Sequence, residues 1–289
     1  MSDGKSDGKS DSKSDSKSDS KSDSKSDSKS VDPTDTTSDA ALIKVIITCF
    51  GPFGGISSNP TLSIVNESSP NISDLLNSNP VTGCIYETYE LPVSTCGVDT
   101  SMSSVFSSSI DTHPGPVIII HCGVDGTQTS DGHFRLERIG FNSKDFRIPD
   151  NSGYQPKNEP IHSQSGDVNS WLGSMCGSSS SVCVDVTVAS PSLDRCLKKL
   201  KENNWSNVKP SNSAGRFVCN YTLYTSLSKA AELNEIREEK VHGMFLHVPS
   251  FELIGEEEQG RFLRDLVQAC VGEVGGEGGR EVYLGPGGG

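Results

Sequence analysis

The chain has 289 residues, nine cysteines and a formal net charge of −13 at pH 7. The acidic balance argues against nucleic acid or an anionic membrane surface as a general partner. No stretch approaches eighteen consecutive apolar residues, so we expect no segment that spans a membrane. No apolar core of a secretion signal lies near the start, which favours a cytoplasmic protein whose thiols are mostly reduced.

Low-complexity sequence lies at both ends. Residues 2–30 repeat DGKS and then DSKS, with seven Asp, seven Lys and no apolar side chain that could offset the entropy of ordering. We therefore expect residues 1–40 to be a disordered tail and the glycine-rich residues 275–289 to be a flexible one. The remaining residues, 41–274, are enough for a single domain.

Apolar runs and helical patterns alternate along this domain. Strands are expected at 43–50, 84–93, 116–123 and 240–249. Helices are expected at 60–68, 97–110, 192–203, 215–234 and 257–272. The alternation predicts an α/β fold, with a mostly parallel twisted sheet and helices on both faces. Residues 162–183 are rich in Ser and Gly, lack a clear period, and are interpreted as a surface insertion.

Cys219 lies in the segment SAGRFVCNY, near the start of the fourth expected helix. Ser213 resembles a helix N-cap, which would place residues 214–216 in the opening turn and Cys219 in the second turn. The positive end of the helix dipole favours a thiolate there, and the thiolate is the nucleophilic form of cysteine. The alternative is that Cys219 packs inward beside Phe217 and Val218.

His247 follows an apolar run that Pro249 ends, and parallel sheets bind ligands at the carboxyl ends of their strands. A histidine there is well placed to act as a base, although His121 and His133 are further candidates. Glu137 lies among apolar neighbours and needs a partner. That partner is either an adjacent arginine or a histidine whose tautomer the carboxylate fixes, as in a Cys–His–acid triad.

Two loops complete the candidate site. The segment CFGPFGGISSNP at 49–60 combines bulky aromatic side chains with a glycine hinge, which suits a wall for a small, flat ligand, or else a cap on the core. The turn-rich segment 147–151 is interpreted as a solvated loop. Cysteine and histidine spacing predicts no metal site, and we expect no cofactor.

Four segments occur in the order typical of one enzyme family. They are ITCFGPFGGISSNP at 47–60, ERIGFNSKDFRIPDNSGYQP at 137–156, SNSAGRFVCN at 211–220 and FLHVP at 245–249. Together they resemble pyroglutamyl peptidase I, a family of cysteine peptidases that remove N-terminal pyroglutamate. The resemblance extends over residues 43–270. One segment departs from it, because this chain reads GVDGTQTSDGHFR at 123–135 where bacterial members read GQAGGR.

The resemblance implies a role for each matching residue. Cys219 would be the nucleophile, His247 the general base and then acid, and Glu137 the residue that orients His247. Residues implied to hold the substrate are Phe50, Phe53, Val124, Arg147, Ile148, Phe217 and Val218.

The function implied is a cysteine exopeptidase that removes a pyroglutamyl residue from peptides through a thioester acyl-enzyme. Its partners would be peptides with N-terminal pyroglutamate, and a homo-oligomer is left open. Two alternatives remain at this point. One is another thiol amidase or acyl-transfer enzyme on the same fold, and the other is a catalytically inactive binding protein.

Overall fold

The computed structural model describes residues 42–55, 59–67, 71–130, 132–162, 183–185 and 193–276. All of them belong to one compact unit, Ala40–Gly289, which is separate from Met1–Asp39. The expected N-terminal tail, nearly all of the expected C-terminal tail and most of the expected insertion at 162–183 lie outside the described residues. Among the helices described, none is long and apolar enough to cross a membrane.

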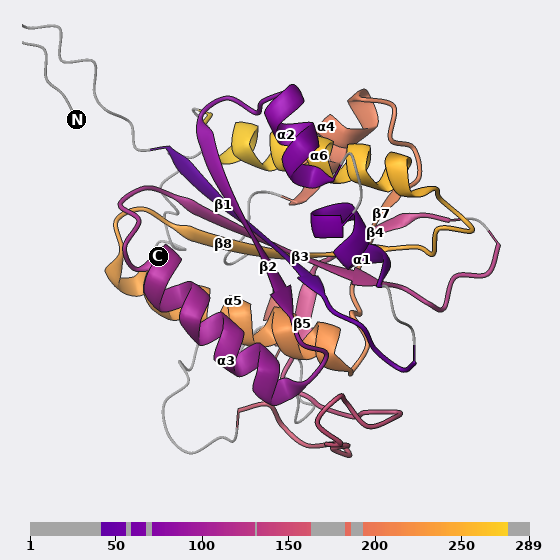
Figure 1. Cartoon of the computed structure of the whole chain (residues 1–289). Helices are drawn as coiled ribbons and strands as arrows, with labels where there is room; N and C mark the ends of the chain where they lie inside the picture. The colour runs from indigo at the N-terminus through magenta and orange to yellow at the C-terminus, as the bar shows by residue number, and fades with distance from the viewer. Residues whose placement is uncertain are drawn as a thin grey trace, which may run out of the picture. The chain divides into compact units, whose positions relative to one another are not determined.

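A six-stranded sheet in the order β2-β1-β3-β8-β4-β7 forms the centre of the fold (Figure 1). Its strands are β1 (Ile43–Phe50), β2 (Cys84–Leu91), β3 (Val117–Val124), β4 (Phe134–Glu137), β7 (Val208–Ser211) and β8 (Val241–Val248). Every neighbouring pair is parallel except β4 and β8, which run antiparallel. The mostly parallel sheet is thus confirmed, and all eight residues of β1 are buried, as expected of a central strand.

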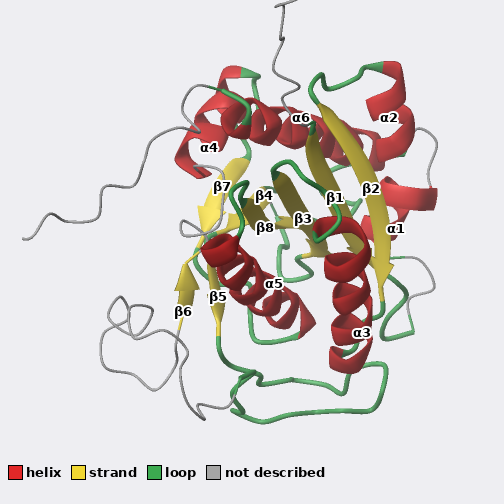
Figure 2. Cartoon of the chain, turned by 90° about the vertical axis from the view of Figure 1, so that its left-hand side faces the viewer, coloured by secondary structure: helices red, strands yellow, loops and turns green. Residues whose placement is uncertain are grey.

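Helices cover both faces of the sheet, α4 and α6 on one and α3 and α5 on the other (Figure 2). The α-helices are α1 (Pro60–Leu62), α2 (Ile72–Ser78), α3 (Thr95–Val105), α4 (Leu193–Glu202), α5 (Val218–Ile236) and α6 (Glu256–Val274). Two π-helical turns, η1 (Ser63–Glu67) and η2 (Phe106–Ile110), continue α1 and α3. This three-layer arrangement is the single α/β domain that the alternating pattern predicts.

Two sequence-based expectations are corrected. Ser213 does not cap a helix, because α5 begins at Val218 and Phe217 occupies the N-cap position in an extended conformation. Gly215 has a left-handed φ of 78°, which a right-handed helix excludes, so the chain turns before the helix starts. In addition, Cys183 is not in a loop, because it opens β6 (Cys183–Asp185), which pairs with β5 (Ile139–Phe141) in a small antiparallel sheet.

The strand β4 has only four residues, but aromatic packing at its first residue stabilises its position. The ring of Phe134, its first residue, stacks on Phe262 of α6 with centroids 3.7 Å apart, and Trp205 packs edge-on against both rings. Aromatic contacts of this kind add to the stability gained by burial. They fix the position from which Glu137 reaches the site described next.

Candidate active site

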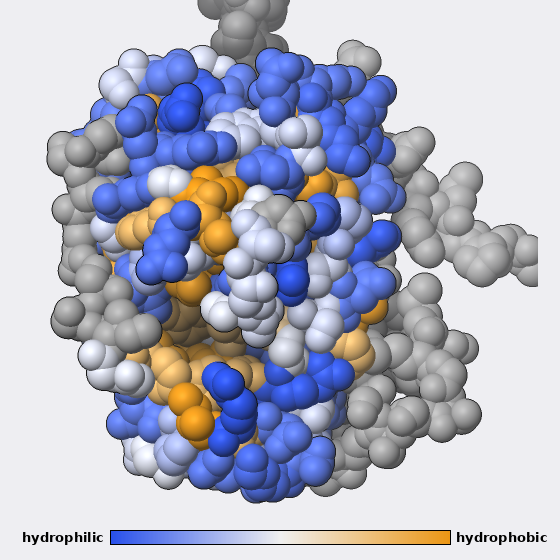
Figure 3. Space-filling model, turned by 90° about the vertical axis from the view of Figure 1, so that its right-hand side faces the viewer, coloured by the Kyte–Doolittle hydropathy of each residue, from blue (hydrophilic) through white to orange (hydrophobic). Residues whose placement is uncertain are grey.

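The carboxyl ends of the parallel strands meet on one face of the domain. Figure 3 shows that this face is hollowed and that apolar side chains gather around the hollow. Ligands of open α/β sheets bind at this edge, because the strands end there and their loops supply the polar groups. The residues that the sequence singles out lie on the elements that end or begin here.

Glu137 and His247 form the buried part of the site. His247 Nδ1 lies 2.8 Å from Glu137 Oε1, and the two side chains are 9% and 0% exposed. The antiparallel register pairs Glu137 with Phe245, so the carboxylate and the imidazole project from neighbouring strands onto one face. Of the two partners that the sequence leaves open for Glu137, the structure therefore shows the histidine.

Cys219 completes the row. Its sulfur lies against Gly123 of β3, the residue that pairs with His247 across the sheet. Burial alone would lower the pKa of His247, but the bonds with Cys219 and Glu137 raise it to about 10. His247 is therefore protonated at neutral pH.

The late start of α5 brings Cys219 closer to the helix end than the sequence predicts. Cys219 is the second residue of the helix, and the first helical hydrogen bond runs from Tyr221 N–H to Phe217 C=O at 3.1 Å. The N–H groups of Val218, Cys219 and Asn220 precede that bond and have no partner within the helix. Such groups can stabilise a negative charge that develops on an oxygen beside the sulfur.

Asn220 is a site residue that the sequence analysis missed. Its buried amide accepts a hydrogen bond from Phe141 N–H and donates to the carbonyls of Phe141 and Ser143, at 2.9 to 3.0 Å. These bonds fasten the first turn of α5 to β5. The only sequence signal was its place directly after Cys219 in a matching motif.

Aromatic rings form one wall beside Cys219. Phe53 and Phe217 are half-buried with centroids 5.2 Å apart, and the buried ring of Phe146 packs on Phe217 at 4.6 Å. Phe50 and Val218 are buried in the core behind them. The half-buried pair is thus the part of this aromatic wall that a ligand can reach directly, and Phe146 is a supporting ring that the sequence analysis did not single out.

The remaining expected slot residues lie near this wall, and none contacts the triad through a hydrogen bond among the described residues. Val124 ends β3, one position beyond Gly123. Arg147 and Ile148 are exposed on a loop that is fixed at both ends. Asp145 N–H donates to the carbonyl of Arg216, and Asn151 Nδ2 donates to the carbonyl of Pro52.

Most of that loop is exposed, as we expected from its sequence, but Asp150 is not. Asp150 is buried, and its carboxylate accepts hydrogen bonds from the N–H groups of Thr95, Ser152 and Tyr154. Burial raises the pKa of Asp150, but these hydrogen bonds and that of the Ser152 hydroxyl outweigh it and lower the pKa. A carboxylate that bonds to four donors organises the loop and ties it to the start of α3.

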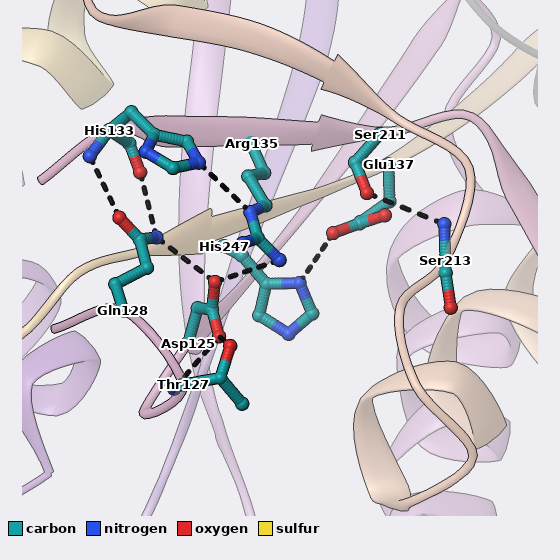
Figure 4. A network of polar contacts seen from close by, with 9 residues as sticks. All are labelled: Asp125, Thr127, Gln128, His133, Arg135, Glu137, Ser211, Ser213 and His247. Atoms are coloured by element: carbon teal, nitrogen blue, oxygen red, sulfur yellow. Dashed lines mark hydrogen bonds and ion pairs between the residues drawn. The ribbon is translucent and has the colours of Figure 1, made fainter. Parts of the chain in front are cut away.

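The other histidines named above have different surroundings. His121 is fully buried with its Nδ1 2.8 Å from Thr48 Oγ1, and burial lowers its pKa to about 3, so it is neutral. His133 belongs to a polar network with Asp125, Gln128 and Arg135 that lies beside His247 (Figure 4). No group of three or more His, Cys, Asp or Glu among the described residues is arranged to hold a metal ion.

Comparisons with known proteins agree with this geometry. The family model for pyroglutamyl peptidase matches residues 43–171 and 190–261. A pyrrolidone-carboxylate peptidase of Vibrio parahaemolyticus is 30% identical over 206 residues, which are 71% of this chain and 78% of that protein. One of Bacillus licheniformis is 29% identical over the same shares of both chains.

Solved structures share the fold. A pyrrolidone carboxyl peptidase from Thermus thermophilus superposes with a TM-score of 0.56 at 23% identity, over 78% of this chain and 99% of that one. The pyroglutamyl peptidase I of Bacillus amyloliquefaciens gives 0.58 at 20% identity, over 79% and 96%. The family model covers well over half of the sequence and includes the segments that carry Glu137, Cys219 and His247, and the chain belongs to the pyroglutamyl peptidase family.

Proposed function

We propose that this chain is a cysteine exopeptidase that removes N-terminal pyroglutamate from peptides in the cytoplasm. Its family membership makes it a peptidase, and thus a hydrolase with peptide substrates. The observation that carries the proposal is the row Glu137–His247–Cys219, with the thiol in the first turn of α5. Acid, base and nucleophile stand in the order that thiol acyl transfer requires.

The first half of the reaction forms an acyl-enzyme. The Cys219 thiolate attacks the carbonyl carbon of the pyroglutamyl residue, and the oxygen becomes an oxyanion that the N–H groups at the start of α5 stabilise. His247 then gives its proton to the leaving amine nitrogen as the C–N bond breaks. Glu137 keeps Nδ1 engaged, so that Nε2 is the nitrogen that exchanges the proton.

The second half releases the product. His247, now neutral, takes a proton from water, and the resulting hydroxide attacks the thioester. The C–S bond breaks, free pyroglutamate leaves, and the thiolate–imidazolium pair is restored. Each step uses only side chains and water.

The slot accounts for the preference for a lactam. Pyroglutamate is flat and uncharged, so the half-buried rings of Phe53 and Phe217 can cover its faces without a charged partner. Phe50 and Val218 close the slot from the core side, and backbone groups near Val124 lie where β3 ends. Arg147 and Ile148 would edge the slot from their fixed loop. We propose no role for a metal, and the chain can act as a monomer or a homo-oligomer.

The test uses three chromogenic substrates and two variants. The protein should release naphthylamine from pyroglutamyl-naphthylamide, and far more slowly from the alanyl and prolyl compounds. Cys219→Ser and Cys219→Ala should each lower kcat/KM at least about a thousandfold. The matched control is Cys96→Ser, which removes an exposed thiol elsewhere and should leave the rate unchanged. Preference for an alanyl or prolyl substrate would indicate another thiol amidase, and no turnover at all would indicate a binding protein.

A further inference from the structure

A positive charge lies beside His247 that the reaction as described does not use. Arg135 is directly opposite His247 in the antiparallel pairing of β4 and β8. Side chains at directly opposite positions share one face, with Cβ atoms about 5 Å apart. Glu137, two residues further along β4, is on the same face. The imidazole therefore has a carboxylate on one side and a guanidinium on the other (Figure 4).

The guanidinium of Arg135 is held in place by two partners. Its Nη1 lies 2.9 Å from Asp125 Oδ2, and its Nε donates to His133 Nε2 at 3.2 Å. Asp125 is 7% exposed at its side chain, whereas Arg135 is 31% exposed. This ion pair is therefore only partly screened by solvent.

The surroundings of Asp125 favour the ionised form of its carboxyl group. Burial raises its pKa, but hydrogen bonds from Thr127 and Gln128 and the charge of Arg135 outweigh burial and lower the pKa. Its own backbone N–H donates to the carbonyl of Val248 at 2.8 Å, directly after His247. The carboxylate is thus tied to the same strand end as the imidazole.

The charges around His247 can be listed by element. Helix α5 contributes Cys219, and β4 contributes Arg135 and Glu137. The connection between β3 and β4 contributes Asp125 and His133, both of which contact Arg135, while β3 itself presents Gly123 opposite the ring. A like charge nearby disfavours a protonated imidazole when nothing offsets it. A carboxylate paired with that charge cancels most of the effect.

We propose that Asp125 is a positioning residue for the catalytic pair: it holds and neutralises the Arg135 guanidinium, and thereby sets the pH range over which thiolate and imidazolium coexist. The proposal rests on the roles proposed for Cys219 and His247. Asp125 lies in the 125–133 connection between β3 and β4, within the segment that departs from the GQAGGR pattern, and the proposal gives this connection a function.

The test measures the rate at which iodoacetamide alkylates Cys219 between pH 4 and 11, by mass spectrometry of the peptide. The rate changes once when the thiolate forms and again when His247 loses its proton, and no substrate is needed. Asp125→Asn leaves a net positive charge beside the pair, so both changes should move about one pH unit lower. Arg135→Gln leaves a net negative charge, so both should move higher. The double variant should return close to the wild type.

The control is Thr127→Val, which removes a hydroxyl bonded to Asp125 Oδ1 but changes no charge, and it should leave both transitions in place. Unshifted transitions in Asp125→Asn, or shifts of the same sign in the two single variants, would overturn the proposal. If Asp125→Asn does not fold, Arg135→Gln decides alone, because only a shift to higher pH supports the role.

This inference and the proposed function can fail separately. If the protein cleaves pyroglutamyl-naphthylamide but the two single variants do not shift the alkylation transitions in opposite directions, the proposed function stands and the role of Asp125 is contradicted. If the transitions shift in opposite directions but the substrate is not cleaved, the role of Asp125 stands and the proposed function is contradicted.

Discussion

At Gly123 the lack of a side chain leaves the space in which the catalytic groups meet. A Cβ built there would lie 2.7 Å from the ring of Phe245 and 3.1 Å from Cys219 Sγ. Gly123→Ala should therefore displace the sulfur from His247 and lower kcat/KM by a hundredfold or more, on the order expected for a misplacement of about 1 Å. Activity and the alkylation rate of Cys219 are the measurements.

Gly126→Ala is the matched control for this variant. A Cβ at Gly126 meets nothing within 4 Å, so the same change three residues later should leave both rates unaltered. An equal loss in the two variants would point to a general effect on the β3 end instead of crowding at the sulfur.

Glu137, Cys219 and His247 were brought together as candidates by the resemblance, and two of them also stand out locally. His247 ends an apolar strand and Glu137 is a carboxylate among apolar neighbours, so each needs an explanation beyond packing. Asn220 and Asp150 were missed for the opposite reason. An amide at a helix start and an aspartate in a turn are ordinary, and their bonds to Phe141 and Thr95 join segments 79 and 55 positions apart.

Between elements, the Asn220 side chain adds hydrogen bonds that join α5 to β5. Asn220→Ala would leave the N–H and C=O of Phe141 and the carbonyl of Ser143 without their amide partner. Each buried polar group left unpaired costs about 1–3 kcal/mol, so unfolding in urea should show a loss of at least about 2 kcal/mol. Activity should fall as well, because the first turn of α5 carries Cys219.

Asn234→Ala tests whether that loss of activity is specific. Asn234 lies near the far end of the same helix and makes a similar bidentate contact with the backbone of Val241. Its replacement should lower stability but leave kcat/KM within about twofold. If both variants lose activity equally, the start of α5 has no special role.

The edge strand β2 is tied to β1 by a charge pair with a defined pH dependence. Lys44 Nζ lies 2.8 Å from Glu87 Oε1. Burial raises the pKa of Glu87, but hydrogen bonds from Lys44, Ser109 and Tyr89 outweigh it and lower the pKa from its usual 4.5 to about 2. A lowered pKa stabilises the fold above pH 4.5, and this contribution is lost as the pH falls toward 2.

Glu87→Gln should therefore unfold at a lower temperature than the wild type at pH 7, and the difference should shrink between pH 4.5 and 2.5. The side chain of Glu87 is 35% exposed, so solvent screening limits the effect to about 1 kcal/mol or less. Glu90→Gln, at an exposed position of the same strand, should show no such dependence. A difference that grows in acid would contradict the assignment.

Among the elements, those with long apolar runs could be predicted from the sequence, whereas a helix start and a very short strand could not. The runs at 43–50 and 116–123 match β1 and β3 within one residue. The start of α5 was placed three residues early, because the capping signal of Ser213 precedes a glycine whose φ of 78° stops the helix. Strand β4 has four residues, too few for a period, although it carries Glu137.

For the whole molecule, the family match leaves the repeat out. It begins at residue 43, after the repeat ends. Removal of residues 2–39 should leave kcat/KM within about twofold and the thermal midpoint unchanged, because none of the described contacts of the site involves that segment. A large loss of either would give the repeat a direct part in folding or catalysis.

The reversed direction of β4 has a consequence for how this enzyme can change. Three paired positions with β8 hold Glu137 in register with His247, and the 125–133 connection lies outside that pairing. Insertions, deletions or substitutions in this connection do not shift the pairing of β4 with β8, so Glu137 keeps its position relative to His247. The loop can therefore vary in sequence while the two side chains stay in place. The pH role that we propose for Asp125 can therefore change with this connection while Glu137 and His247 keep their register.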